Sequence, residues 1–182
     1  MKLYFVTSNK NKVEEAKELL KDFEVEQLNI DLPEIQSLDG KEILLFKLKE
    51  ALKHKKGNII VEDSHLVING MNGLPGPFIK WFKDTTGVEG LYKLSKSFGG
   101  DATAKVVVGY AKNSKEIFFF EGKIDGKIAS PRGEPRFFWD TVFIPDGHKK
   151  RFSEMALDEK NRISHRKIAF EKLKKHLSPY NK

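Results

Sequence analysis

Apolar and polar positions follow two different periods along this chain, and each period predicts a kind of element. Residues 3–7 form an apolar run with a polar boundary, which is typical of a buried strand. Residues 10–23 predict a helix, because apolar side chains recur at helical spacing at Val13, Ala16, Leu20 and Phe23. A second strand is predicted over residues 25–32, closed by Pro33, and a second amphipathic helix over residues 43–53.

The pattern of residue types changes in the next segments. Residues 58–63 (NIIVED) predict a short buried strand that ends in two carboxylates, and residues 70–82 carry loop chemistry before a helix. A helix is expected over residues 88–98, and two strands, 103–111 and 116–124, form an antiparallel hairpin. Residues 126–133 predict a further short strand and a loop, and residues 164–177 a last helix stopped by Ser178-Pro179.

These elements predict a mixed α/β architecture in one domain, residues 1–182, without repeats or a clear linker. Strands alternate with helices in the first part, and a hairpin-rich part follows. A cleft between the two parts is the expected place for a site.

Composition narrows the class of protein. The chain has 182 residues, of which 39% are hydrophobic and 11% aromatic, so it is expected to fold as a globule. It has no apolar run long enough for a membrane span and no signal-peptide pattern, so we expect a cytoplasmic protein. Zero cysteine excludes disulfides and thiolate metal sites. The net charge of +7 favours anionic partners, although lysine-rich helical stretches account for much of it as solvated faces.

The segment TSNKNK, residues 7–12, joins the first strand to the first helix. Its small polar side chains can cap the helix, and on this stretch alone capping is the favoured interpretation. The alternative is a phosphate site, formed by free backbone N–H groups at the helix start and by Lys12.

Acidic and basic side chains follow other predicted elements. Glu62 and Asp63 at a strand end, with Glu34 after another strand, suit Mg²⁺, and a simple strand-terminating turn is the alternative. In GLPGPFIKW, Lys80 is a phosphate candidate beside a rigid loop. The aromatic run at residues 137–140 (FFWD) either stacks on a nucleobase or belongs to the core. EKNRISHRK places Lys160, Ser164, His165 and Arg166 around a helix start, where a basic surface turn is the alternative.

In this order the motifs resemble those of the inosine triphosphate pyrophosphatases, which hydrolyse non-standard purine nucleoside triphosphates. The family pattern runs F-V-T-G-N-x-x-K, D-L-P-E, V-E-D-T-S-L, G-G-L-P-G-P-Y-I-K-W, P-R-G…F-G-W-D, P-D-G and E-K-N…S-H-R. The chain matches it with FVTSNKNK, DLPE, VEDSHL, NGLPGPFIKW, PRGEPRFFWD, PDG and EKNRISHR, from residue 5 to about residue 173.

The resemblance implies hydrolysis of ITP, dITP and XTP to the monophosphate and pyrophosphate with Mg²⁺, or with Mn²⁺ as the alternative ion. It also implies a central mixed, twisted sheet flanked by helices, two lobes around a nucleotide cleft, and a homodimer. Neither a membrane nor a stable nucleic-acid partner is expected.

Site residues carry over by position. The triphosphate is expected to meet Thr7, Ser8, Asn9, Lys10, Asn11, Lys12, Lys47 and Lys80. Glu34 and Asp63 match metal ligands, Asp63 also matches the catalytic base, and Ser64 borders the nucleotide. The base-holding positions are Phe137, Phe138, Trp139, Asp140, Lys160, His165 and Arg166. Whether Glu62 joins the metal site is left open.

Three positions depart from the family pattern. Ser8 and Phe138 stand where the family has Gly, and Thr141 stands where it has Pro. Phe adopts positive φ far less readily than Gly, so base selectivity and turnover are the properties these departures affect. Two rival functions follow: a related pyrophosphatase with another base preference, and a basic nucleic-acid-binding module.

Overall fold

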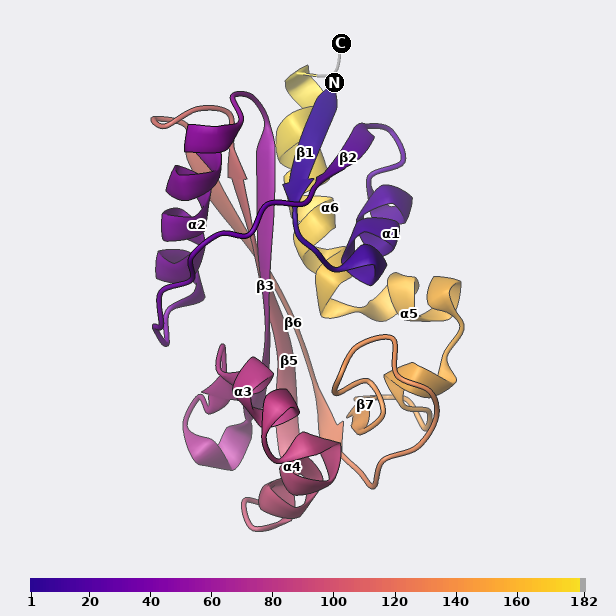
Figure 1. Cartoon of the computed structure of the whole chain (residues 1–182). Helices are drawn as coiled ribbons and strands as arrows, with labels where there is room; N and C mark the ends of the chain where they lie inside the picture. The colour runs from indigo at the N-terminus through magenta and orange to yellow at the C-terminus, as the bar shows by residue number, and fades with distance from the viewer. Residues whose placement is uncertain (181–182) are drawn as a thin grey trace. The chain divides into compact units, whose positions relative to one another are not determined.

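The computed structural model describes residues 1–180 and holds one mixed sheet. Its order is β2-β1-β3-β5-β6-β7, and β4 pairs with β3. The strands are β1 (Lys2–Val6), β2 (Glu24–Leu28), β3 (Ile59–Ile68), β4 (Pro75–Gly76), β5 (Asp101–Ala111), β6 (Ile117–Ile128) and β7 (Phe143–Pro145) (Figure 1). β1 runs parallel to β2 and β3, whereas the β3–β4 and β6–β7 pairs are antiparallel. The predicted mixed α/β architecture is therefore confirmed.

Six α-helices accompany the sheet within the described residues. They are α1 (Lys10–Leu19), α2 (Gly40–His54), α3 (Ile79–Asp84), α4 (Gly87–Lys96), α5 (Leu157–Ile163) and α6 (His165–Leu177). Short 3₁₀ turns are η1 (Asn69–Met71), η2 (Phe152–Glu154) and η3 (Ser178–Tyr180). Within the described residues, 1–180, no helix is both long and apolar enough to cross a membrane.

The chain divides into two compact units, each assembled from separate segments. The first unit comprises residues 1–63, residues 106–122 and the C-terminal segment from Arg166. The second unit comprises residues 64–105 and 123–165. Strands β3, β5 and β6 contribute residues to both units.

Strand alternation builds the core of the first unit on two faces of its sheet. Leu3 and Phe5 of β1 contact α1 and α6, while Val6 belongs to the cluster around α2. β3 repeats this pattern, with Ile60 on the α1–α6 side and Val61 on the α2 side. Since successive strand residues point to opposite faces, helices cover both faces of this part of the sheet (Figure 1).

The core of the second unit is richer in aromatic side chains. Leu66 and Ile68 of β3 pack with Ile79 of α3 and Leu91 of α4. The segments after β6 complete this cluster with Trp139, Val142, Phe143, Phe152 and Met155. This core supports the segment that carries the predicted base-holding residues.

Several element boundaries differ from the predictions. β3 does not end at the carboxylates: it continues through Glu62 and Asp63 to Ile68, because the next turn residues come only at Asn69-Gly70. The strands predicted before and after Gly126 are one strand, β6. α1 ends at Leu19 rather than at Phe23. β7 and α5 were not predicted, because both are short and lack a long period.

The predicted β5–β6 hairpin is confirmed. The two strands are neighbours in the sheet, and only residues 112–116 join them. A parallel pair would need a crossover of about a dozen residues. The amide of Lys112 donates to the carbonyl of Glu116 at 3.1 Å and closes the turn.

Candidate functional site

The start of α1 is a capped helix N-terminus, as the capping interpretation predicts. The Asn9 side-chain oxygen accepts hydrogen bonds from the backbone amides of Asn11 at 3.0 Å and Lys12 at 3.4 Å. Thr7 Oγ1 accepts from the Asn9 amide at 3.1 Å and fixes the residues before the helix. The cap satisfies amides that helix geometry otherwise leaves without acceptors. A phosphate at this position would exchange with the Asn9 side chain.

A buried ion network joins three predicted residues in the first unit. Arg166 donates from Nε to Glu62 Oε2 at 2.9 Å and from Nη2 to Glu62 Oε1 at 2.7 Å. Lys12 Nζ lies 3.2 Å from the same Glu62 Oε1, and Arg166 Nη1 donates to Glu15. The Arg166 and Glu62 side chains are at most 2% exposed, so each charge depends on the others for compensation.

This network determines the protonation state of Glu62. Burial by itself raises the pKa of a carboxyl group, but the nearby charges of Arg166 and Lys12 and their hydrogen bonds outweigh it. The net result is a Glu62 pKa far below its ordinary value of 4.5. Burial likewise disfavours the charged Arg166, yet Glu62 and Glu15 raise the pKa of its guanidinium. Glu62 is therefore a carboxylate committed to cations of the protein.

Asp63 differs from its neighbour in exposure. It follows Glu62 on β3 and is half-buried, because adjacent strand residues point to opposite faces. Glu34 is exposed in the segment before α2, and its carboxylate pairs with Lys47 of α2. Arg166 and Lys12 bind both Glu62 oxygens in the interior, whereas Asp63 and Glu34 are the more exposed of the predicted carboxylates and are accessible to a cation.

The donor groups of the first unit limit the kind of metal centre it can form. Among the described residues, no group of three or more His, Asp and Glu side chains is placed to hold a metal ion. Mg²⁺ typically keeps several waters and takes one or two carboxylates together with substrate phosphates. The carboxylates of Asp63 and Glu34 fit that pattern, whereas a cation held by the protein alone does not.

A second buried ion pair gathers predicted residues in the second unit. Lys160 Nζ donates to Asp140 Oδ2 at 2.7 Å, and the two side chains are 2% and 1% exposed. The ammonium also lies 4.4 Å from the centre of the Phe137 ring, within the range of a cation–π contact. The loop segment and α5 therefore meet at a site with an aromatic face and paired charges.

Two further predicted residues pack ring against ring, at a tilt, in the same unit. The rings of Trp139 and His165 lie 5.3 Å apart, and Phe152 contacts both, at 6.2 Å from each ring. Trp139 and His165 are buried to 5% and 1% exposure. Their contacts are those of a core cluster that supports the Lys160 site.

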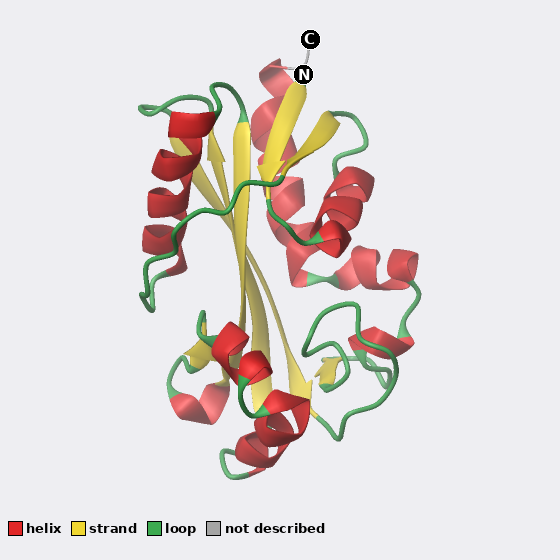
Figure 2. Cartoon of the chain, in the orientation of Figure 1, coloured by secondary structure: helices red, strands yellow, loops and turns green. Residues whose placement is uncertain are grey.

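The remaining predicted positions are more exposed. Lys80 lies on the surface of α3, and Ser64 is half-buried on β3. Phe138 lines a cavity of about 530 Å³ in the second unit, together with residues of α3, α4 and the β6–β7 connection. Figure 2 shows this connection in green, the colour shared by loops and turns.

Sequence reasoning missed three kinds of residue. Glu15, fully buried on α1, is one turn from Lys12 and beside Ala16, so its position on the apolar face was a usable signal. Phe152 lies on a short turn without periodicity. The cavity residues Lys83, Val88 and Arg132 come from three segments, and no local pattern connects them.

The chain is similar to known proteins over nearly its whole length. A model described as the Ham1 family matches residues 3–176. The inosine triphosphate pyrophosphatase of Schizosaccharomyces pombe is 43% identical over 175 residues, covering 94% of this chain and 93% of the relative. The protein of the same name from Puccinia graminis is 38% identical over 188 residues, covering 98% and 97%.

Solved structures share the fold. A HAM1 protein from Coxiella burnetii superimposes with a TM-score of 0.85 at 24% identity, covering 98% of this chain and 99% of that one. The Ham1 protein of Staphylococcus aureus gives a TM-score of 0.78 at 22% identity, covering 99% and 100%. At these identities the superpositions speak for the fold, and the family model and the curated relatives carry the assignment: the chain belongs to the Ham1 family.

Proposed function

We propose that this chain hydrolyses inosine triphosphate and related non-standard purine nucleoside triphosphates to the monophosphate and pyrophosphate. The observation that carries the proposal is the 43% identity with an inosine triphosphate pyrophosphatase over 94% of the chain. dITP and XTP are the other substrates we assign, so the activity would remove deaminated purines from the nucleotide pool. Residues 1–182 act as one enzymatic domain in this proposal, with two lobes around a nucleotide cleft.

The phosphate side of the reaction is assigned to residues of the first unit and to Lys80. Lys12 and Lys47 supply cationic donors, and the α1 N-terminus supplies amides once a phosphate replaces the Asn9 cap. Lys12 is held by Glu62, so its side chain starts from a fixed position. Phosphoryl transfer depends on such positioning and charge neutralisation more than on covalent chemistry.

Asp63 is assigned as the catalytic base. Its carboxylate would accept a proton from the attacking water, which then adds to phosphorus as pyrophosphate leaves. Asp63 and Glu34 would hold Mg²⁺, which when bound neutralises phosphate charge and lowers the pKa of a coordinated water. The half-exposed position of Asp63, in contrast to buried Glu62, supports this division of roles.

Base recognition is assigned to the Lys160 site. Phe137 offers a stacking face, while Lys160 offers donors suited to a 6-keto oxygen. Adenine carries an amino group at that position, which would leave a donor without an acceptor and so cost binding energy. His165 and Arg166, the other residues expected at the base, are held by ring stacking and by carboxylates respectively.

The test is pyrophosphate release from ITP, dITP, XTP, GTP and ATP, with Mg²⁺ and after chelation. We expect release from the first three and a loss of activity on chelation. Equal rates on ATP would overturn the selectivity, and no release from any nucleotide would overturn the enzyme assignment. Release from a modified pyrimidine triphosphate alone would favour the rival base preference suggested by Phe138.

The proposed oligomer is a homodimer, by the family resemblance. Light scattering of the purified chain over a concentration series checks it, and a constant monomer mass would refute it. The cytoplasmic location stays a prediction, to be checked by imaging a tagged copy in cells.

A further inference from the structure

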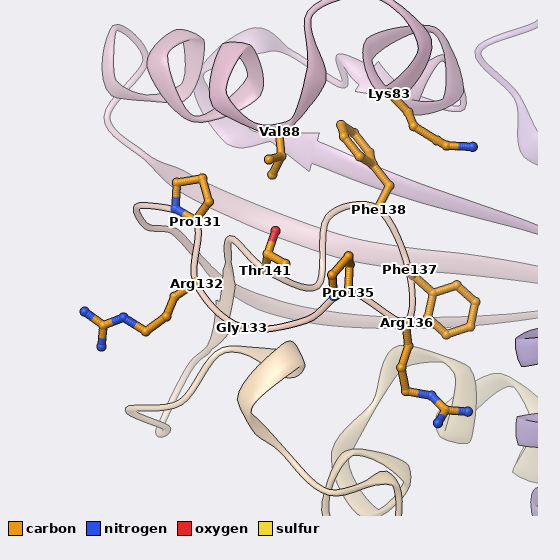
Figure 3. A pocket seen from close by; sticks show the side chains of 10 residues that line it. All are labelled: Lys83, Val88, Pro131, Arg132, Gly133, Pro135, Arg136, Phe137, Phe138 and Thr141. Carbon is orange, nitrogen blue, oxygen red and sulfur yellow. The ribbon is translucent and has the colours of Figure 1, made fainter.

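The two residues that depart from the family pattern around the F-G-W-D motif line the same cavity. Phe138 and Thr141 both face a space of about 530 Å³ that is lined only by residues of the second unit. Figure 3 shows the Phe138 and Thr141 side chains among the lining residues, with Phe138 turned towards Val88 of α4, and Phe137 and Arg136 of the same loop also line the space. Phe137, the aromatic face of the Lys160 site, also lines the cavity, whereas Asp140, Lys160 and His165 are not among the lining residues, so the cavity adjoins that site through Phe137.

The cavity has the size and lining of a small-molecule site. Pockets for such ligands typically measure about 300–1,000 Å³ and combine apolar walls with a few polar groups. Here Val88, Pro131, Pro135 and Phe138 provide apolar walls. The loop is held in shape, because the Arg132 amide donates to the Thr141 carbonyl at 2.9 Å and Ser153 Oγ donates to the Arg132 carbonyl at 2.6 Å.

One polar group in the wall is unsatisfied. Thr141 is 6% exposed, and its Oγ1 has no hydrogen-bond partner among the described residues. A buried hydroxyl without a partner is destabilising, and a ligand atom in the cavity would satisfy it. A hydroxyl both donates and accepts, so Thr141 can meet either a keto or an amino group.

The charges around the cavity favour an anion. Lys83 and Arg132 extend at opposite ends of it (Figure 3), and none of the described lining residues carries a carboxylate. Each cation has an exposed acidic neighbour beyond hydrogen-bond distance: Lys83 lies 3.8 Å from Asp84, and Arg132 lies 3.8 Å from Glu154. Val88 also brings the N-terminal turn of α4 to the cavity wall, and a helix N-terminus attracts negative charge.

We propose that this cavity is a second binding site, for a purine nucleoside monophosphate. The base stacks on the Phe138 ring, Thr141 Oγ1 hydrogen-bonds its edge, and Lys83 or Arg132 pairs with the phosphate. Since Thr141 accepts or donates, the site takes adenine and hypoxanthine alike. This broader base preference distinguishes the cavity from the Lys160 site, which is assigned to 6-keto bases.

The experiment is calorimetric titration of the full chain with AMP, which the Lys160 site is expected to reject. We expect one AMP per chain. Phe138→Ala should weaken binding about tenfold, since stacking on an aromatic ring contributes about 1–3 kcal/mol. Thr141→Val and Lys83→Met should each weaken it as well. Circular dichroism of every variant checks that the fold is retained.

Two further variants place the ligand. Lys93→Met removes an exposed lysine of α4 that does not line the cavity, and it should leave AMP affinity unchanged. Loss of AMP binding in Lys160→Met with retention in Phe138→Ala would overturn the proposal, as would the absence of binding at millimolar AMP. Pyrophosphate release from ITP is measured separately, so failure of this second site leaves the hydrolase assignment standing.

Discussion

His165 and Arg166, adjacent at the start of α6, make their contacts in two different compact units. The His165 ring packs 5.3 Å from Trp139, whereas the Arg166 guanidinium donates to Glu62 and Glu15. Neighbouring helical residues point about 100° apart, so one helix start can serve two clusters. The predictions below separate the roles of these clusters.

The first prediction concerns the proposed catalytic base, Asp63. Asp63→Asn should lower kcat for ITP by about 10²–10⁴-fold, because an amide cannot accept the proton of the attacking water. Steady-state kinetics measures this, with circular dichroism to check the fold. The control Asp158→Asn removes an exposed carboxylate that pairs with Arg162, and its kcat should match that of the wild type. Undiminished turnover in Asp63→Asn would remove that residue from the mechanism.

The second prediction concerns the buried network. Arg166→Leu leaves Glu62 and Glu15 without their shared cation, so the free energy of unfolding should fall by about 3–5 kcal/mol. Urea denaturation measures the change. Arg162→Leu is the matched control: its salt bridge is 77% and 70% exposed, and the expected loss is below about 1 kcal/mol. Equal losses in the two variants would show that burial does not increase the contribution of the network to the free energy of unfolding.

The third prediction is a pH dependence of stability. The folded-state pKa of Glu62 lies below its ordinary value of 4.5, so the unfolded chain binds more protons there. The stability due to Glu62 is thus complete above about pH 4.5 and is lost as the pH falls below it. Denaturation midpoints at a series of acid pH values should decline less steeply in Glu62→Gln than in the wild type. Parallel declines in the two proteins would contradict a lowered folded-state pKa of Glu62.

The fourth prediction concerns Lys160 and Asp140. Lys160→Met should raise KM for ITP and also destabilise the fold, because Asp140 keeps a buried charge without its lysine. The double variant Lys160→Met/Asp140→Leu should recover stability but not the KM. Lys150→Met, which removes an exposed partner of Glu159, is the control and should change neither property. A wild-type KM in Lys160→Met would exclude Lys160 from base recognition.

The sequence predicted the features that depend on residues close together in the chain, such as a helix cap or the helical spacing of apolar side chains. Asn9, at the end of an apolar strand and before an amphipathic run, was predictable as a cap, and it caps α1. The buried faces of α1 and α6 followed from helical spacing. In contrast, the length of β3 did not follow from the sequence, because two adjacent carboxylates are typical of a strand end, whereas tertiary pairing extends this strand past them.

Contacts between distant segments were beyond local reasoning. The motif predicts that Arg166 contacts the nucleobase. Nothing in its local sequence indicates that it binds Glu62, 104 residues earlier. The cavity beside Phe138 likewise depends on how α3, α4 and the β6–β7 connection pack. Such arrangements follow from the whole core, whose packing no single segment encodes.

The segmented first unit has a consequence for synthesis on the ribosome. Its core contains Leu3 and Phe5 of β1, yet the same cluster needs Ala169, Phe170, Leu173 and Leu177 of α6. The earliest strand therefore waits for nearly the entire polypeptide before its apolar face is covered, and a nascent chain lacking α6 exposes that face to aggregation or to chaperones.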